Sequence, residues 1–240
     1  MRKNLFAGTQ ADASYAVRSS YWPGIDLIPA MPALYNAEFY LPTRQIEERQ
    51  SGLRFYDILG AGLEPLRQTY DVIVIDTAPS LSYTTMNAYM AADGMIVPMP
   101  PNALDFASSA QFWALFADLV EGIQQHGERR EYDFLHVLLA KVDQADDNTR
   151  VVASWIAKTY GEFVLQVEVP KTNVASKSAI EFGTVFDVTR YEGGSQTYKR
   201  AAQAYNRFVD LVEGSIRQAW VNQLADAGAG PVQATADAAA

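Results

Sequence analysis

YDVIVIDTAPS, residues 70–80, is the stretch of sequence that decides the fold. Val72 to Ile75 are consecutive β-branched residues, a pattern typical of a strand that is covered on both faces, as in a parallel sheet. Asp76 ends this run, and ligands of open α/β sheets bind beyond the carboxyl ends of the strands. We therefore predict that Asp76 holds Mg²⁺, or its water shell, beside a nucleotide. The alternative for an Asp in this position is a turn or a helix cap.

Apolar runs alternate with helical stripes on both sides of this stretch. Upstream, GIDLIPA (24–30) predicts a short buried strand, and leucines at three- and four-residue spacing predict a helix over 53–69. Downstream, we expect helices near 84–90 and at 103–125, 147–160 and 196–224, and strands at 94–99, 134–140 and 163–167. Asp147 or Asn148 is the expected cap of the third of these helices. The alternation predicts an α/β fold with a mainly parallel, doubly wound sheet and right-handed crossovers.

The composition excludes several classes of site. The 240 residues contain no cysteine, which excludes disulfides, thiolate zinc sites, iron–sulfur clusters and cysteine nucleophiles. There is no apolar run of the roughly 18 residues that a membrane span needs, so we expect a cytoplasmic protein. The net charge of −9 repels nucleic acid at long range, and any contact with DNA must use a local basic patch.

The stretch YDVIVIDTAPSLS resembles the Walker B and switch segment of the ParA family of DNA-partition ATPases, whose pattern is Asp, two residues, Pro, one residue, Leu. Asp76, Pro79 and Leu81 match that pattern. GIDLIPA and AEF (37–39) upstream, the helix with Asn87, and IVPMPPNALDFASS (96–109) downstream follow in the family's order. The resemblance covers roughly residues 21–216 and is nearest to the larger plasmid-type members. It implies a fold of the P-loop NTPase type.

The resemblance also implies a set of site residues and two cofactors, ATP and Mg²⁺. Asp76 would organise the magnesium, and the segment Thr77 to Ser82, with Pro79, would sense the terminal phosphate. The base would lie near four residues that follow later strands of the sheet, namely Lys141, Asp143, Pro170 and Lys171. A solvated turn before a helix is the alternative for the aspartates after Lys141.

Partners follow from the same resemblance. Members of the family form ATP-bound homodimers on the nucleoid, bind DNA nonspecifically and meet a ParB-like centromere-binding protein. The candidates for DNA contact are Lys199, Arg200 and Arg207, because residues seven or eight apart share one face of a helix. An ordinary solvated face is the alternative. His126 and His136 have no partner histidine at ligand spacing and are expected to be structural.

A phosphate-binding loop is absent from these 240 residues. Such a loop needs glycines, then a Lys for the outer phosphates and a Ser or Thr for magnesium, but the sequence contains no Gly-Lys pair. We therefore expect an N-terminal segment of uncertain structure (1–23), the C-terminal part of a ParA-like ATPase domain (24–225) and a disordered tail (226–240). The chain would be an incomplete partition protein without ATPase activity of its own.

Two other functions fit the sequence. The first is a degenerate partner in the partition complex that binds without turnover. The second is a MinD-like ATPase that cycles on and off membranes, suggested by an apolar stripe along the last helix, with Phe208, Leu211, Val212, Ile216, Ala219 and Trp220. Membrane-surface helices usually carry several Lys or Arg residues on their polar face, and this one has only Arg217 near its end. We therefore expect the stripe to pack on the domain, and we expect no membrane partner.

Overall fold

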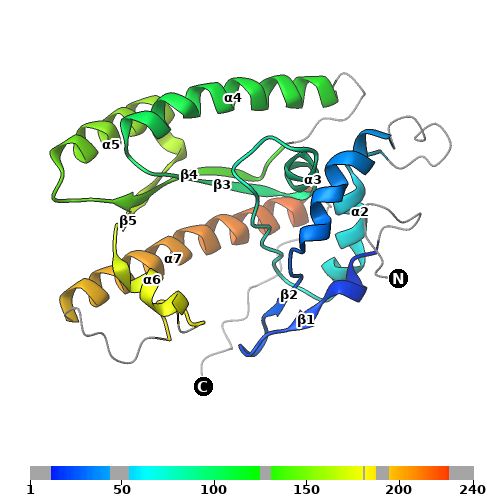
Figure 1. Cartoon of the computed structure of the whole chain (residues 1–240), viewed down its shortest axis with the longest axis horizontal. Helices are drawn as coiled ribbons and strands as arrows, with labels where there is room; N and C mark the ends of the chain where they lie inside the picture. The colour runs from blue at the N-terminus through cyan, green and yellow to red at the C-terminus, as the bar shows by residue number, and fades with distance from the viewer. Residues whose placement is uncertain (1–11, 44–53, 125–130, 181, 188–194, 227–240) are drawn as a thin grey trace. The chain divides into compact units, whose positions relative to one another are not determined.

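The structure is a computed structural model that describes residues 12–43, 54–124, 131–180, 182–187 and 195–226 (Figure 1). The chain forms two compact units. Unit 1 comprises residues 1–93 and 118–130, and unit 2 comprises residues 94–117 and 131–240. The predicted disordered tail lies outside the described residues from 227 onward.

Unit 2 contains a parallel three-stranded sheet, as the sequence predicts. The strands are β3 (Gly94–Met99), β4 (Phe134–Val142) and β5 (Val164–Pro170), in the order β3-β4-β5. Both pairs, β3 with β4 and β4 with β5, are parallel. The α/β fold class with a parallel sheet is therefore confirmed.

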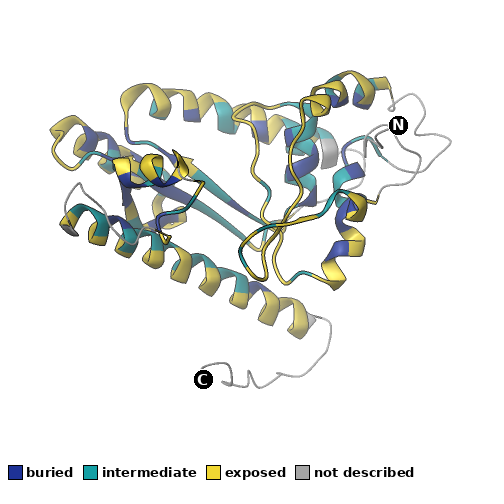
Figure 2. Ribbon diagram, turned by 60° about the horizontal axis from the view of Figure 1, so that its bottom comes forward, coloured by how far each residue is buried: buried dark blue, intermediate teal, exposed yellow. Residues whose placement is uncertain are grey.

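Helices cover both faces of this sheet (Figure 1). On one face lie α5 (Asp147–Tyr160), followed by η5 (Gly161–Phe163), and the part of α4 (Ala103–Gln124) that belongs to unit 2, up to residue 117. On the other face lies α7 (Ser195–Asp226). The short helix α6 (Asn173–Ile180) was not predicted. Strand positions are buried or half-buried for the most part, whereas much of α7 is exposed (Figure 2). The predicted helices at 103–125, 147–160 and 196–224 are thus confirmed to within two residues.

The side chains of β4 alternate between two cores. Val137 and Leu139 join a cluster with Ile156 of α5, whereas Leu138 joins a cluster with Leu165 of β5 and side chains of α7. Successive residues of a strand point to opposite faces, so an unbroken apolar run is what a strand between two helical layers requires.

The start of the sheet depends on a glycine. Gly94 pairs with Phe134 in the register of β3 and β4, and a Cβ at Gly94 would lie 2.3 Å from the Phe134 ring. A side chain at position 94 would require the Phe134 ring to move. The aromatic ring therefore covers the first residue of β3 only because that residue is glycine.

Unit 1 consists of short elements. They are η2 (Ser14–Ala16), β1 (Arg18–Ser19), β2 (Asp26–Leu27), η3 (Pro32–Asn36), helical residues 37–43, α2 (Ile58–Leu63), η4 (Glu64–Gln68) and α3 (Tyr83–Ala91). One small core joins Ala37, Leu41 and Ile58, and another joins Leu63, Leu66 and Ala91 with neighbours. The predicted helix near 84–90 is confirmed as α3.

Several predictions in unit 1 are wrong. Residues 72–75 form no strand, and GIDLIPA contributes only Asp26–Leu27, which pairs antiparallel with β1 and is exposed. The predicted helix over 53–69 is limited to α2 and η4. A β-branched run becomes a strand only when a neighbouring strand binds its backbone, and none of the described strands pairs with residues 72–75.

The predicted cap of α5 is wrong by one residue. Asp146 is the N-cap, and its Oδ1 accepts a hydrogen bond from the Asn148 backbone N–H at 3.0 Å. Asp147 instead lies in the first turn, where a negative charge also favours the helix.

No helix among the described residues is both long enough and apolar enough to cross a membrane.

Candidate functional site

The segment that carries Asp76 lies exposed in unit 1. Residues 72–79 have neither helix nor strand, and the side chains of Asp76, Thr77 and Pro79 are all exposed. Val74, at 88% exposure, is more exposed than any other large hydrophobic side chain in the described residues. The predicted emergence of Asp76 from a buried strand is therefore wrong, although its carboxylate is open to solvent as a metal ligand must be.

Two contacts hold the upstream end of this segment. Ile75 is half-buried and packs against a core that includes Leu63 and Leu66. The Tyr70 hydroxyl donates a hydrogen bond to Asp26 Oδ2 at 2.5 Å, and this bond, with the neighbouring negative charge, raises the pKa of Tyr70. A residue of GIDLIPA therefore contacts the start of YDVIVIDTAPS. Both stretches are among the motifs that carry the resemblance to the ParA family.

The downstream end of the segment is the start of α3. Ser82 is the N-cap, and its Oγ accepts a hydrogen bond from the Thr85 backbone N–H at 3.2 Å. Glu38 accepts three more bonds there: from Tyr83 N to Oε2 at 3.0 Å, from Thr84 N to Oε1 at 3.0 Å, and from the Thr84 hydroxyl at 2.9 Å. The helix thus begins with its first backbone donors satisfied.

These contacts determine the ionisation of Glu38. Burial acts to raise its pKa, but the hydrogen bonds from Thr84, Tyr83 and Ser82 outweigh burial, and the net pKa is lowered. Hydrogen bonds that favour the charged form have this effect. Glu38 is therefore a carboxylate at neutral pH, placed where the positive end of the helix dipole favours it.

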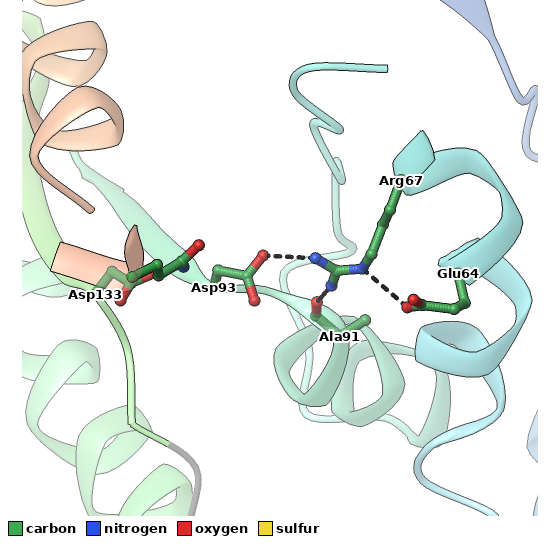
Figure 3. A network of polar contacts seen from close by, with 6 residues as sticks. Glu64, Arg67, Ala91, Asp93 and Asp133 are labelled. Carbon is green, nitrogen blue, oxygen red and sulfur yellow. Dashed lines mark hydrogen bonds and ion pairs between the residues drawn. The ribbon is translucent and has the colours of Figure 1, made fainter. Parts of the chain in front are cut away.

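The other end of α3 is held by a cation (Figure 3). Arg67 Nη2 donates to the Ala91 carbonyl oxygen at 3.1 Å, and Nη1 donates to Asp93 Oδ2 at 3.0 Å. Arg67 Nε lies 3.5 Å from Glu64 Oε2. The Ala91 carbonyl belongs to the last turn of α3, where a positive charge is favourable. The helix dipole is therefore complemented at both ends, by the negative Glu38 at the N-terminus and by the positive Arg67 at the C-terminus.

Asn87 joins α3 to the segment before it. Its side chain is completely buried. Its Nδ2 donates to the carbonyl oxygens of Phe55 at 2.9 Å and Tyr83 at 3.0 Å, and its Oδ1 accepts from Leu59 N at 3.1 Å. The asparagine in the matching motif is therefore a structural link between α2 and α3.

The candidate base-binding residues come together in unit 2. Val142 of β4 pairs with Pro170 of β5, and the Lys171 backbone N–H donates to the Val142 carbonyl at 2.9 Å. The Lys171 ammonium lies 3.4 Å from Asp143 Oδ2, and both side chains are substantially exposed. Asp143 and Lys171 therefore form an ion pair at the carboxyl edge of the sheet, where ligands of this fold class bind.

Lys141 occupies an unusual backbone conformation beside this pair. Its φ of 56° is left-handed, which is uncommon for a residue other than glycine. The register of β4 against β5 shifts between Leu139 and Val142, which is the pattern of a β-bulge. Bulges are frequent next to ligand sites because they redirect the chain.

The candidate DNA residues lie on α7. Lys199, Arg200 and Arg207 are all exposed. Arg200 Nη1 donates to Gln144 Oε1 at 3.2 Å, and Arg150 Nη2 donates to the Gln144 carbonyl at 2.9 Å. Arg200 therefore contacts the loop that follows β4, directly after Asp143.

The apolar stripe of α7 faces the sheet. Phe208, Leu211 and Val212 pack against the cluster of Leu138, Leu165 and Val169. Ala219 is buried, whereas Trp220 is 42% exposed. The expectation that the stripe packs on the domain is confirmed for its first half.

His136 is structural, as expected. Its Nε2 lies 2.7 Å from Ser215 Oγ of α7, and burial lowers its pKa. His126 lies outside the described residues.

The donors around Asp76 are compatible with Mg²⁺. Among the described residues there is no group of three His, Asp or Glu side chains that could hold a metal ion. Mg²⁺ usually takes only one or two protein carboxylates and completes its shell with water and phosphate oxygens. An exposed carboxylate followed by the Thr77 hydroxyl fits that requirement, whereas a closed metal cage does not.

Glu38 is the functional candidate that sequence reasoning missed. It lies in the AEF motif, yet its partners are 45 and 46 residues away. Helical periodicity and capping patterns reach only a few residues along the chain. A motif match at AEF was the one available signal, and it gave no role to the glutamate.

Comparisons with known proteins identify the family. The family model described as an AAA domain matches residues 3–127. Protein SopA of Escherichia coli (strain K12) is 31% identical over 184 residues, covering 76% of this chain and 46% of SopA. The chromosome partitioning protein ParA of Caulobacter vibrioides is 30% identical over 190 residues, covering 75% of this chain and 64% of that protein. The chain spans about half the length of the first curated relatives it matches.

Solved structures share the fold. A structure described as a partition protein superposes with a TM-score of 0.65 at 19% identity, covering 89% of this chain and 59% of the other. An ATP complex of a variant of Cyanothece McdA superposes with a TM-score of 0.63 at 16% identity, covering 85% of this chain and 73% of the other. The family model and the curated relatives agree: this chain belongs to the ParA family of partition ATPases, matched by the AAA-domain model.

Proposed function

We propose that this chain supplies the magnesium side of a ParA-type nucleotide site and acts in plasmid or chromosome partition. The observation that carries the proposal is the exposed Asp76 carboxylate, which lies on a segment held at Tyr70 and Ile75 on one side and at the start of α3 on the other. Asp76 would hold Mg²⁺ with water and phosphate oxygens, which supplies charge stabilisation to the phosphates.

Residues 77–82 would respond to the outer phosphate. They have neither helix nor strand and end at the N-cap Ser82. Such a segment can change its backbone angles without breaking a regular element. Thr77 would offer its hydroxyl beside the metal, and Pro79 would restrict the backbone of the segment through its fixed φ.

The candidate base-binding residues lie in unit 2. The ion pair of Asp143 with Lys171 and the neighbouring Lys141 and Pro170 lie at the carboxyl ends of β4 and β5. A carboxylate can accept hydrogen bonds from a base, and a proline ring can pack on one. This assignment rests on the family resemblance and on the grouping of these four residues.

Hydrolysis by the 240 residues alone is not expected. The sequence contains no Gly-Lys pair, so no lysine follows a glycine-rich loop to position the outer phosphates. We propose that catalysis requires a phosphate-binding loop from outside these residues. The second candidate function, a non-catalytic member of a partition complex, is favoured by the same observation.

The proposed partners follow from family membership. They are a second copy of the chain, a ParB-like centromere-binding protein and nonspecific DNA on the nucleoid. Lys199, Arg200 and Arg207 would contact phosphates, and that contact should weaken with salt, because each phosphate that a cation neutralises releases bound counterions.

Nucleotide binding with an exposed-site control tests the proposal. A fluorescent ATP analogue should bind more tightly with Mg²⁺ than with EDTA, and Asp76→Ala should remove only the magnesium-dependent part. Asp71→Ala is the matched control, because Asp71 is also exposed and lies at the other end of the same apolar run. Equal losses in the two variants, or turnover above blank that disappears in Asp76→Ala, would refute the proposal.

A further inference from the structure

The start of α3 is capped twice, once locally and once from a distance. The Ser82 hydroxyl oxygen accepts a hydrogen bond from the Thr85 backbone N–H, three residues away, as an ordinary N-cap does. The two preceding amides, of Tyr83 and Thr84, go to Glu38, which lies 45 and 46 residues earlier. The local cap alone would leave those two donors to solvent.

The bonds to Glu38 are of the stronger kind. The acceptor is a carboxylate, and hydrogen bonds to charged groups are roughly twice as strong as neutral ones. The three donor–acceptor distances lie between 2.9 and 3.0 Å, and Glu38 is half-buried. The groups that favour its charged form are all neutral donors, from Ser82, Tyr83 and Thr84.

The backbone beside Glu38 is held by packing. Glu38 directly follows Ala37, which is fully buried in a core with Leu41 and Ile58. The contact therefore ties the first turn of α3 to a packed part of unit 1. Two adjacent backbone donors held by one carboxylate also fix the direction in which the helix begins.

We infer that Glu38 is a positioning residue of the nucleotide site, which anchors the first turn of α3 so that the segment from Thr77 to Ser82 moves against a fixed end. This inference rests on the proposed function, in which that segment responds to the outer phosphate. With Glu38 in place, a displacement of the segment bends the chain at Ser82. Without it, the same displacement unwinds the first turn of α3.

Hydrogen exchange of the 240-residue chain, followed amide by amide with NMR, tests this assignment. Glu38→Ala should reduce the protection of the Tyr83 and Thr84 amides by about tenfold or more, since a charged hydrogen bond contributes at least about one decade to an opening equilibrium. Glu38→Gln, whose amide oxygen still accepts, should restore part of that protection. Ser82→Ala is the matched control and should lower the protection of Thr85 instead.

The pH profile separates positioning by the carboxylate from simple packing. In the unmodified chain, the protection of Tyr83 and Thr84, corrected for intrinsic exchange, should fall in a single step at a pH below the ordinary value of 4.5 for glutamate. Glu38→Gln should abolish that step, and Ser82→Ala should keep it. Unchanged protection in Glu38→Ala, or a step that persists in Glu38→Gln, would overturn the inference.

Addition of magnesium and ATP distinguishes the two proposals. If the amide signals of residues 76–82 shift in the unmodified chain, Glu38→Ala should extend the shifts into Tyr83, Thr84 and Thr85, whereas Ser82→Ala should extend them to Thr85 alone. Shifts that stop at Ser82 in Glu38→Ala would refute the positioning role. If magnesium and ATP move no signal in the unmodified chain, the proposed function fails, while the pH profile still decides whether Glu38 anchors the helix.

Discussion

Replacement of Val74 by alanine should change the free energy of unfolding by less than about 0.5 kcal/mol, the usual range for surface substitutions. Val74 is 88% exposed and lies in a segment without helix or strand, so little apolar surface is lost. The matched variant is Val137→Ala in β4, where valine is completely buried. That change removes the equivalent of two methylene groups, about 1.6 kcal/mol of transfer free energy, and it also leaves a cavity. We therefore expect a loss of about 1.5–3 kcal/mol at Val137.

The assay is urea unfolding of both variants, followed by circular dichroism and by tryptophan fluorescence. A shift of the midpoint at constant slope reports stability alone. If Val74→Ala cost as much as Val137→Ala, Val74 would be buried in solution and the β-branched run would be paired. The exposed placement of residues 72–76, and with it the open environment described for Asp76, would then be wrong.

Three further predictions concern stability. Asn87→Ala should cost at least about 2 kcal/mol in urea unfolding, because it leaves the part-buried backbone groups of Leu59 and Phe55 without their partner, and each costs about 1–3 kcal/mol. Glu38 has a lowered pKa, so its contribution to the free energy of unfolding is complete above pH 4.5 and is lost as the pH falls through its folded-state pKa. Glu38→Gln should flatten that part of the curve of stability against pH. An unchanged slope in this variant would contradict the prediction. Burial lowers the pKa of His136 from 6.5, so the unfolded chain binds more protons below that pH and stability should decline from pH 6.5 downward; His136→Gln, which can still reach Ser215, should remove the decline.

The sequence predicted unit 2 better than unit 1, for a physical reason. In unit 2, β3 begins and ends where the apolar run of residues 94–99 begins and ends, and α4 and α5 match their predicted ranges within one residue. Each of these elements buries its apolar pattern against another described element. Local pattern and tertiary packing therefore favour the same structure, which makes the prediction reliable.

In unit 1 the same kind of pattern failed. Val72 to Ile75 have high strand propensity, but propensity measures how well side chains suit a sheet and does not create the neighbouring strand. None of the described strands pairs with them. The short strands and 3₁₀ turns of residues 14–36 likewise depend on contacts such as that of Tyr70 with Asp26, which join residues 44 apart.

Residue chemistry and order were enough to identify the family and the α/β class, because a motif such as Asp76, Pro79 and Leu81 consists of residues close together in the sequence. The site residues that the resemblance names remain predictions. Only the tertiary structure decided which of those residues meet: Asp143 with Lys171 across two strands, Arg200 with Gln144, and Glu38 with the first turn of α3. Such contacts join residues from 28 to 56 positions apart, and they form because burial of the sheet and of the small cores brings distant backbone segments together. The periodic patterns of the sequence extend over only a few residues, so they do not predict contacts between residues this far apart in the chain.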